Sequence, residues 1–201
     1  MRAARVCSLA IFTSLWMGYG LTAAEADTSH DHSEHTGMTT MEEMPEAVVH
    51  VAVDSAAQNQ IDRLVGAYLM IAEQLAHDRL DSLAGPFEQM SMAVQMLSKN
   101  KKDNTDHVAM LAAQVAGSIP KETKDIKKVR ASFEVLSAAV IALVEKAPPS
   151  HMAGHGINKA YCPMKSAAWL QQGADILNPY YGSEMLGCGS IKNAIEMVHH
   201  N

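Results

Sequence analysis

Residues 126–143 read IKKVRASFEVLSAAVIAL, and they show the clearest periodicity in the 201-residue chain. Apolar side chains recur at alternating steps of three and four: Ile126, Val129, Phe133, Leu136, Val140 and Leu143. This spacing places them along one face of an α-helix, which Pro148 and Pro149 would end. The stretch therefore predicts a long amphipathic helix that packs against other helices.

Three weaker patterns of the same kind precede this helix. They cover residues 61–75, 83–97 and 108–119, with polar or proline-containing segments between them. Four amphipathic helices joined by short connections predict an all-α fold, an antiparallel four-helix bundle over residues 47–147. Residues 148–201 are expected to form a Cys/Met-rich segment of short helices and turns, packed on the bundle.

No segment alternates apolar and polar residues over a useful length, so no strand is predicted. Residues 166–177 and 190–199 are instead predicted to be short helices. Met90, Met96 and Met110 lie on apolar helix faces, and we expect them to fill gaps in the core.

Residues 1–24 have the pattern of a secretory signal: Arg2 and Arg5, an apolar run, and small residues at a cleavage site. This predicts export to the periplasm, with no stable membrane anchor after cleavage. The net charge of −6 gives the chain no electrostatic reason to bind nucleic acid.

Residues 25–46 are polar and show no apolar periodicity, which predicts a disordered arm. The arm contains three histidines followed by three evenly spaced methionines: His30, His32, His35, Met38, Met41 and Met44. Imidazoles suit Cu(II) and Zn, whereas thioethers suit Cu(I). The even methionine spacing, in a segment with no core to fill, favours ion capture over a solvated tail of biased composition.

The main candidate site lies in the last quarter of the chain, where two cysteines each have a methionine nearby. Met164 follows Cys162 by two residues, and Met185 precedes Cys188 by three, so each pair can direct two sulfurs to one point. Thiolate and thioether sulfurs are soft ligands that select Cu(I) and similar ions. A structural disulfide is the alternative in an oxidising compartment, and the two states can also alternate.

Two histidines just upstream, His151 and His155, lie in a linker that contains Gly and Pro and are candidate additional ligands. The ligand types favour Cu(I) as the bound ion, with Ag(I), Cu(II) or Zn as alternatives.

Several motifs of this region occur together in one known family: Cys162-Pro163-Met164, Trp169-Leu170-Gln171, Asn178-Pro179-Tyr180-Tyr181-Gly182, Met185-Leu186 and Cys188-Gly189. The region resembles an exported helical domain of formally unknown function, found alone or at the C-termini of periplasmic adaptor proteins of copper/silver efflux systems. The resemblance implies heavy-metal handling outside the cytoplasm, with the two cysteines, Met164 and Met185 as ligands. The chain has no room for the other adaptor domains, which implies a free-standing form.

The sequence contains none of the common catalytic motifs, so we do not expect an enzyme. The leading hypothesis is a periplasmic protein that sequesters copper or silver, or delivers it to an efflux adaptor or another metal-handling partner. The alternative is a disulfide-stapled helical interaction module of an envelope complex, with incidental metal binding.

Overall fold

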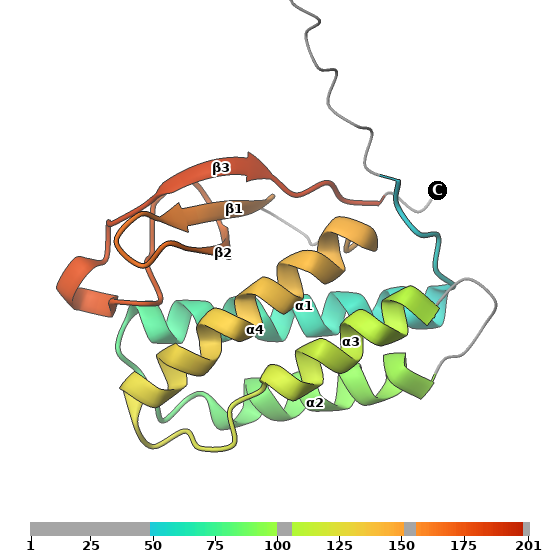
Figure 1. Cartoon of the computed structure of the whole chain (residues 1–201), viewed down its shortest axis with the longest axis horizontal. Helices are drawn as coiled ribbons and strands as arrows, with labels where there is room; N and C mark the ends of the chain where they lie inside the picture. The colour runs from blue at the N-terminus through green and yellow to red at the C-terminus, as the bar shows by residue number, and fades with distance from the viewer. Residues whose placement is uncertain (1–48, 100–105, 151–155, 199–201) are drawn as a thin grey trace, which may run out of the picture. The chain divides into compact units, whose positions relative to one another are not determined.

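The computed structural model describes residues 49–99, 106–150 and 156–198. Its helices are α1 (Ser55–Ala76), α2 (Ala84–Lys99), α3 (Asp106–Ser118) and α4 (Ile126–Lys146). The strands β1 (Ile157–Cys162), β2 (Ala167–Gln172) and β3 (Ser190–Ala194) follow, with a short 3-10 helix, η1 (Gly182–Met185), before β3 (Figure 1). The prediction of four helices is confirmed, but the all-α fold class is wrong because the C-terminal segment forms a sheet.

The helices form where the apolar periodicity placed them. Asp54 caps α1 by accepting a hydrogen bond from the Ala57 N–H (2.8 Å), and Asp125 caps α4 through the Lys127 N–H (2.9 Å). Consecutive helices are neighbours in space, and their apolar faces form the core. None of the helices in the described residues has the length and apolar character needed to span a lipid bilayer.

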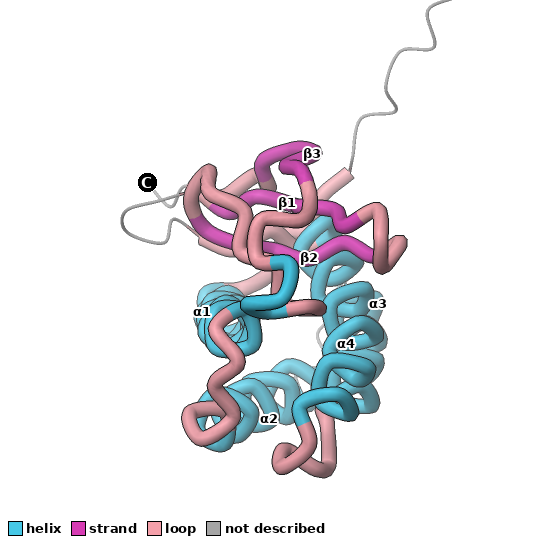
Figure 2. The backbone as a smooth tube through the Cα atoms, turned by 90° about the vertical axis from the view of Figure 1, so that its left-hand side faces the viewer, coloured by secondary structure: helices cyan, strands magenta, loops and turns pink. Residues whose placement is uncertain are grey.

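The three strands form an antiparallel sheet in the order β2-β1-β3. Ala160 of β1 pairs with Trp169 of β2, and Tyr161 of β1 pairs with Ser190 of β3. The sheet covers the side of the helical layer formed by α1 and α4, and α2 and α3 lie beyond those two helices (Figure 2). The core is therefore shared between the helices and the inner face of the sheet.

The helices predicted at residues 166–177 and 190–199 are replaced by β2 and β3. The sequence of β2, AAWLQQ, contains good helix formers, but its environment overrides that preference. Two core tyrosines form hydrogen bonds with backbone groups along the outer edge of β2. Tyr68 accepts from the Leu170 N–H (3.2 Å), and Tyr180 donates to the Ala168 carbonyl (2.5 Å). The extended conformation is thus fixed by residues distant in sequence.

Tyr68 connects three elements at the centre of the molecule. Its hydroxyl lies 2.7 Å from the Ser137 hydroxyl of α4, besides accepting from Leu170 of β2. Its ring stacks on Phe133 with a centroid distance of 5.2 Å. Burial raises the pKa of Tyr68 far above its usual value, so the hydroxyl stays neutral. This tyrosine therefore joins the sheet to the helices.

Candidate metal centre

Cys162 lies at the end of β1, where the chain turns into β2. It pairs with Ala167, so residues 163–166 form the loop of the β1–β2 hairpin. Ser166 has a φ of +55°, in the left-handed region that tight turns use. The Cys162 side chain is buried, whereas Met164, in the hairpin loop, is 65% exposed. The Cys-Pro-Met motif thus places a thiol inside the protein and a thioether at its surface.

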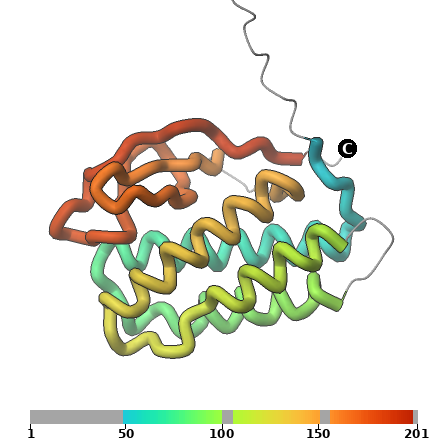
Figure 3. Tube along the Cα trace, viewed as in Figure 1, coloured from blue at the N-terminus to red at the C-terminus, as the bar shows by residue number. Residues whose placement is uncertain are grey.

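Cys188 lies between η1 and β3, in the segment that Figure 3 traces back toward the hairpin. Its N–H donates to the Met185 carbonyl (3.0 Å), and its carbonyl accepts from the side-chain amide of buried Asn178 (2.6 Å). The same Asn178 side chain accepts from the Tyr180 N–H (2.9 Å). One asparagine therefore holds the Asn-Pro-Tyr-Tyr turn and the Cys188 backbone together.

The position of Cys188 is also fixed by the residue that follows it. Gly189 has a φ of +146°, and a Cβ there would lie 2.7 Å from Cη2 of the Trp169 indole. Trp169 is fully buried, as expected for a packing residue, and its Nε1 donates to the Gln171 side chain (3.1 Å). The indole therefore lies directly against the backbone that follows Cys188.

An ion-pair network attaches this region to the helices. Arg130 of α4 donates to the Leu75 carbonyl of α1 (2.7 Å) and to the Pro179 carbonyl of the turn (3.0 Å). It also pairs with Asp78, just after α1, and Asp78 accepts from the Ser183 N–H in η1 (3.0 Å). The helices thus set the position of the turn that leads to Cys188.

These constraints bring the two cysteine sulfurs together. Cys162 Sγ and Cys188 Sγ are 3.8 Å apart, and neither thiol is in a disulfide. Two thiolates bound at about 2.3 Å to one tetrahedral ion would also lie about 3.8 Å apart. The pair is therefore spaced to share an ion, and a small approach would also allow a disulfide.

The surroundings of Cys188 favour its neutral form in the absence of an ion. Burial and the neighbouring Cys162 raise the pKa of the Cys188 thiol, and a backbone hydrogen bond from Met164 opposes the shift. Lys165, three residues after Cys162, forms a 2.8 Å ion pair with Glu134 of α4. Glu134, chiefly, raises the pKa of Lys165, and Cys162 adds to the shift. A cation therefore stands near any negative charge on the thiolates.

The structure brings together part of the predicted ligand set. Cys162 and Cys188 meet, the Met164 backbone bonds to Cys188, and half-buried Met185 lies one turn before it. The other candidates lie outside the described residues: His151, His155, His30, His32, His35, Met38, Met41 and Met44. Within the described ranges, no group of three or more His, Cys, Asp or Glu side chains is placed to hold a metal ion.

Sequence reasoning missed the residues that position the thiols. Asn178 belongs to a motif that marked the resemblance, but nothing in the sequence indicated that its side-chain amide would bond to the Cys188 carbonyl. Comparison with known proteins gives no match for this chain among family models, curated proteins or solved structures.

Proposed function

We propose that this protein binds a soft monovalent ion, Cu(I) or Ag(I), through Cys162 and Cys188. The observation that supports it most directly is the 3.8 Å separation of two unbridged sulfurs at the end of the sheet. Met164 and Met185 are the thioethers nearest in sequence to these thiols and would complete the ligand set. Their soft sulfur donors suit Cu(I) and Ag(I) better than hard cations.

The ligand types favour a monovalent ion over zinc. A structural Zn²⁺ site usually uses Cys, His or carboxylate ligands. Thioethers such as those of Met164 and Met185 are soft ligands that suit Cu(I) and Ag(I) instead. Two thiolates and one monovalent ion leave a single negative charge, which the nearby Lys165 would partly compensate. We therefore place Cu(I) and Ag(I) ahead of Zn and Cu(II).

The physiological role we propose is sequestration of the ion, or its delivery to an efflux adaptor or another metal-handling partner, in the periplasm. The protein would act as a binding protein and not as an enzyme. His30, His32, His35, Met38, Met41 and Met44 would capture ions at lower affinity, with His151 and His155 as additional ligands. Affinity would fall as the pH falls, because protons compete for thiolates and imidazoles.

The experiment is a Cu(I) titration of the reduced full chain against a competing chelator. C162S combined with C188S should lower the affinity of the tightest site by about 100-fold or more, since loss of outer-shell partners alone commonly costs 10–100-fold. The matched control is C7S, which removes a cysteine from the predicted signal and leaves the pair intact. If the double variant binds Cu(I) as tightly as the wild type, the proposal fails.

The same geometry supports a second candidate, a disulfide-stapled interaction module. The sulfurs need to approach only to about 2.05 Å to form a bond, and exported proteins commonly contain disulfides. Intact mass under non-reducing conditions distinguishes the two candidates. A pair that is found oxidised and resists mild reductants would favour the staple, whereas a reduced or easily reduced pair would favour metal binding.

A further inference from the structure

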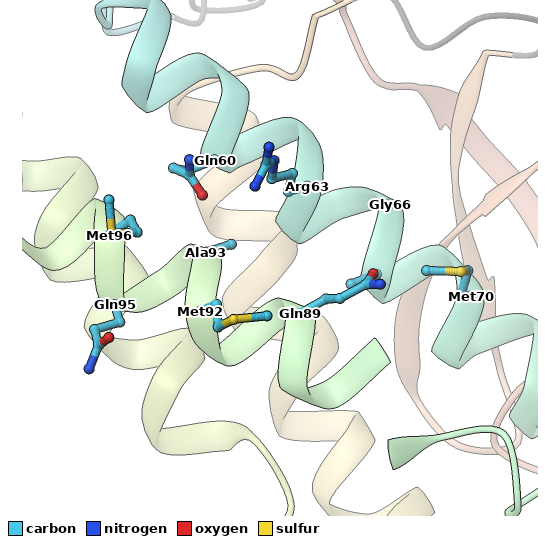
Figure 4. Close-up of a pocket in the computed structure, with 10 residues that line it drawn as sticks. Gln60, Arg63, Gly66, Met70, Gln89, Met92, Ala93, Gln95 and Met96 are labelled. Atoms are coloured by element: carbon cyan, nitrogen blue, oxygen red, sulfur yellow. The ribbon is translucent and has the colours of Figure 1, made fainter. Parts of the chain in front are cut away.

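A second group of soft ligands lies on the helices, away from the sheet. α1 and α2 form a groove of about 690 Å³ between them, with small residues such as Gly66, Ala67 and Ala93 in its lining. Three methionines line the same groove: Met70 from α1, and Met92 and Met96 from α2 (Figure 4).

The side chains of these three methionines are not packed in the hydrophobic core. Met70 is 41% exposed, Met92 55% and Met96 54%, whereas Met90 of the same α2 helix is completely buried. The prediction that Met96 fills the core is therefore wrong, and the same holds for Met110, at 51% exposed. Methionine is usually among the buried residue types, so three exposed ones along one groove call for another explanation.

Among metal ions, the lining that the described residues give this groove suits a soft one. Its remaining polar side chains are the neutral amides of Gln60, Gln89 and Gln95, together with Arg63. The described residues that line it include no carboxylate, imidazole or thiol, which hard cations and Zn²⁺ would need. The positive charge of Arg63 opposes a divalent ion more strongly than a monovalent one. The strong metal ligands among these described lining residues are thus the thioethers, which bind Cu(I) and Ag(I).

The placement of the three sulfurs allows a shared ion. Met92 and Met96 are four residues apart on α2, where Cβ atoms lie about 5–6 Å from each other. In the view of Figure 4, Met92 lies between Met96 and Met70, and the Gln89 side chain stands between Met92 and Met70 of α1, so the sulfurs do not meet in the conformations drawn. Methionine side chains have three rotatable bonds, so rotation can bring their sulfurs toward one point.

We propose that this groove is a second, thioether-only binding site for Ag(I) or Cu(I), centred on Met92 with Met70 and Met96 as its other ligands. The proposal goes beyond the cysteine site and does not depend on it. Thioethers have no proton to lose at accessible pH, so this site keeps its ion in acid, where thiols and imidazoles release theirs. It would provide acid-resistant storage on a face of the protein separate from the cysteines.

The test uses the full chain carrying C162S and C188S, with methionine methyl groups labelled for NMR, titrated with silver nitrate. Near neutral pH and again at about pH 4, where imidazoles are protonated, the Met70, Met92 and Met96 methyl signals should shift together and saturate. Met110, similarly exposed but on α3, is the internal control and should not shift. No shift at the three groove methionines, or an equal shift at Met110, would overturn the proposal.

Leucine variants separate metal binding from apolar contact. Met92→Leu keeps the apolar volume but removes the sulfur, and it should weaken Ag(I) binding in the groove at least about tenfold. In a background that also carries C7S, M38L, M41L and M44L, which removes the third thiol and the thioethers of residues 25–46, the triple variant M70L/M92L/M96L should lower the silver retained at low pH, while M110L should have no effect. Retention that the triple variant leaves unchanged would show that the groove thioethers are not the ligands. Since both cysteines are absent throughout, neither outcome depends on the cysteine site.

Discussion

At the scale of single residues, the geometry of the candidate metal centre depends on close contacts around one glycine. Gly189 follows Cys188 directly, has a φ of +146°, and lies against the Trp169 indole. Gly187, on the other side of the same cysteine, has open space where a Cβ would be. The two glycines therefore provide a matched pair on either side of one candidate ligand.

Gly189→Ala should destabilise the protein by about 1–3 kcal/mol, because the new methyl group meets Trp169 and the backbone conformation is one that alanine disfavours. Gly187→Ala should change stability by no more than about 0.5 kcal/mol. Urea denaturation of the reduced proteins measures both free energies of unfolding. Equal effects of the two substitutions would show that Trp169 does not restrict the backbone after Cys188.

At the scale of secondary structure, the sheet depends on the helices for its outer edge. Replacing Tyr68 with Phe removes the hydroxyl that forms hydrogen bonds with the Ser137 hydroxyl of α4 and the Leu170 N–H of β2. Leaving those buried groups unpaired should cost about 1–3 kcal/mol of unfolding free energy. Tyr161→Phe is the control, because that half-buried ring contacts Lys192 and lies outside the Tyr68 network.

Hydrogen exchange gives a second measurement of the same prediction. Protection of the Leu170 amide should fall in the Tyr68→Phe variant more than protection of amides within α2. A uniform loss of protection across the molecule would instead mean that the hydroxyl contributes only to global stability, and that β2 does not depend on it locally.

The connection between α1, α4 and η1 should respond to pH. Hydrogen bonds from Ser183 and Arg130 lower the pKa of Asp78 from 3.8 to about 2. Because the folded-state pKa is lowered, the stabilisation is complete above about pH 5, begins to fall as the pH approaches the ordinary pKa of 3.8, and is lost as the pH falls through about 2. The effect should stay below about 1 kcal/mol, since the carboxylate is partly exposed.

The measurement is the difference in unfolding free energy between the wild type and Asp78→Asn as a function of pH. That difference should be constant from neutral pH down to about pH 5 and then shrink as Asp78 becomes protonated. A difference that stays unchanged down to pH 2 would contradict the proposed role of the carboxylate charge.

The elements also show how far the sequence could predict this fold. The helices were predictable because each has enough turns for its apolar periodicity to be visible, as in α4. The strands were not, because β2 is six residues long and buries Trp169, Leu170 and Gln171 in succession, which removes any alternation. Tyr68, about a hundred residues earlier in the chain, helps to keep β2 extended through its hydrogen bond with Leu170, and the sequence around β2 gives no sign of that contact.

The candidate site was predictable to a similar extent. The residue types indicated soft ligands in the last quarter, but the proximity of Cys162 and Cys188 depends on strand pairing that the sequence did not reveal. The groove methionines were missed because an apolar residue type in a helix does not by itself fix a core position. Met90 and Met96 belong to the same helix, but Met90 is buried and Met96 is 54% exposed.

At the scale of the whole molecule, the two cysteines connect parts of the fold that move apart on unfolding. Cys162 ends β1, and Cys188 follows the turn that Arg130 attaches to the helices. An ion bound to both sulfurs therefore binds only the folded state, and binding must stabilise that state. A disulfide would also stabilise the protein, through loss of entropy in the unfolded chain, but it would leave no thiolate to bind metal.

The final prediction follows from this competition and is best tested in the M70L/M92L/M96L background, where the groove contributes nothing. The reduced protein should gain about 2.7 kcal/mol when free Ag(I) is 100-fold above its Kd. For a chain of this size, that gain corresponds to a rise in Tm of about 5–10 °C. The oxidised protein should start from a higher Tm and show no response to Ag(I), and C162S/C188S should show neither effect. An oxidised protein that responds to Ag(I) as strongly as the reduced one would mean that the ion binds elsewhere, so that the cysteine pair acts as a structural staple alone.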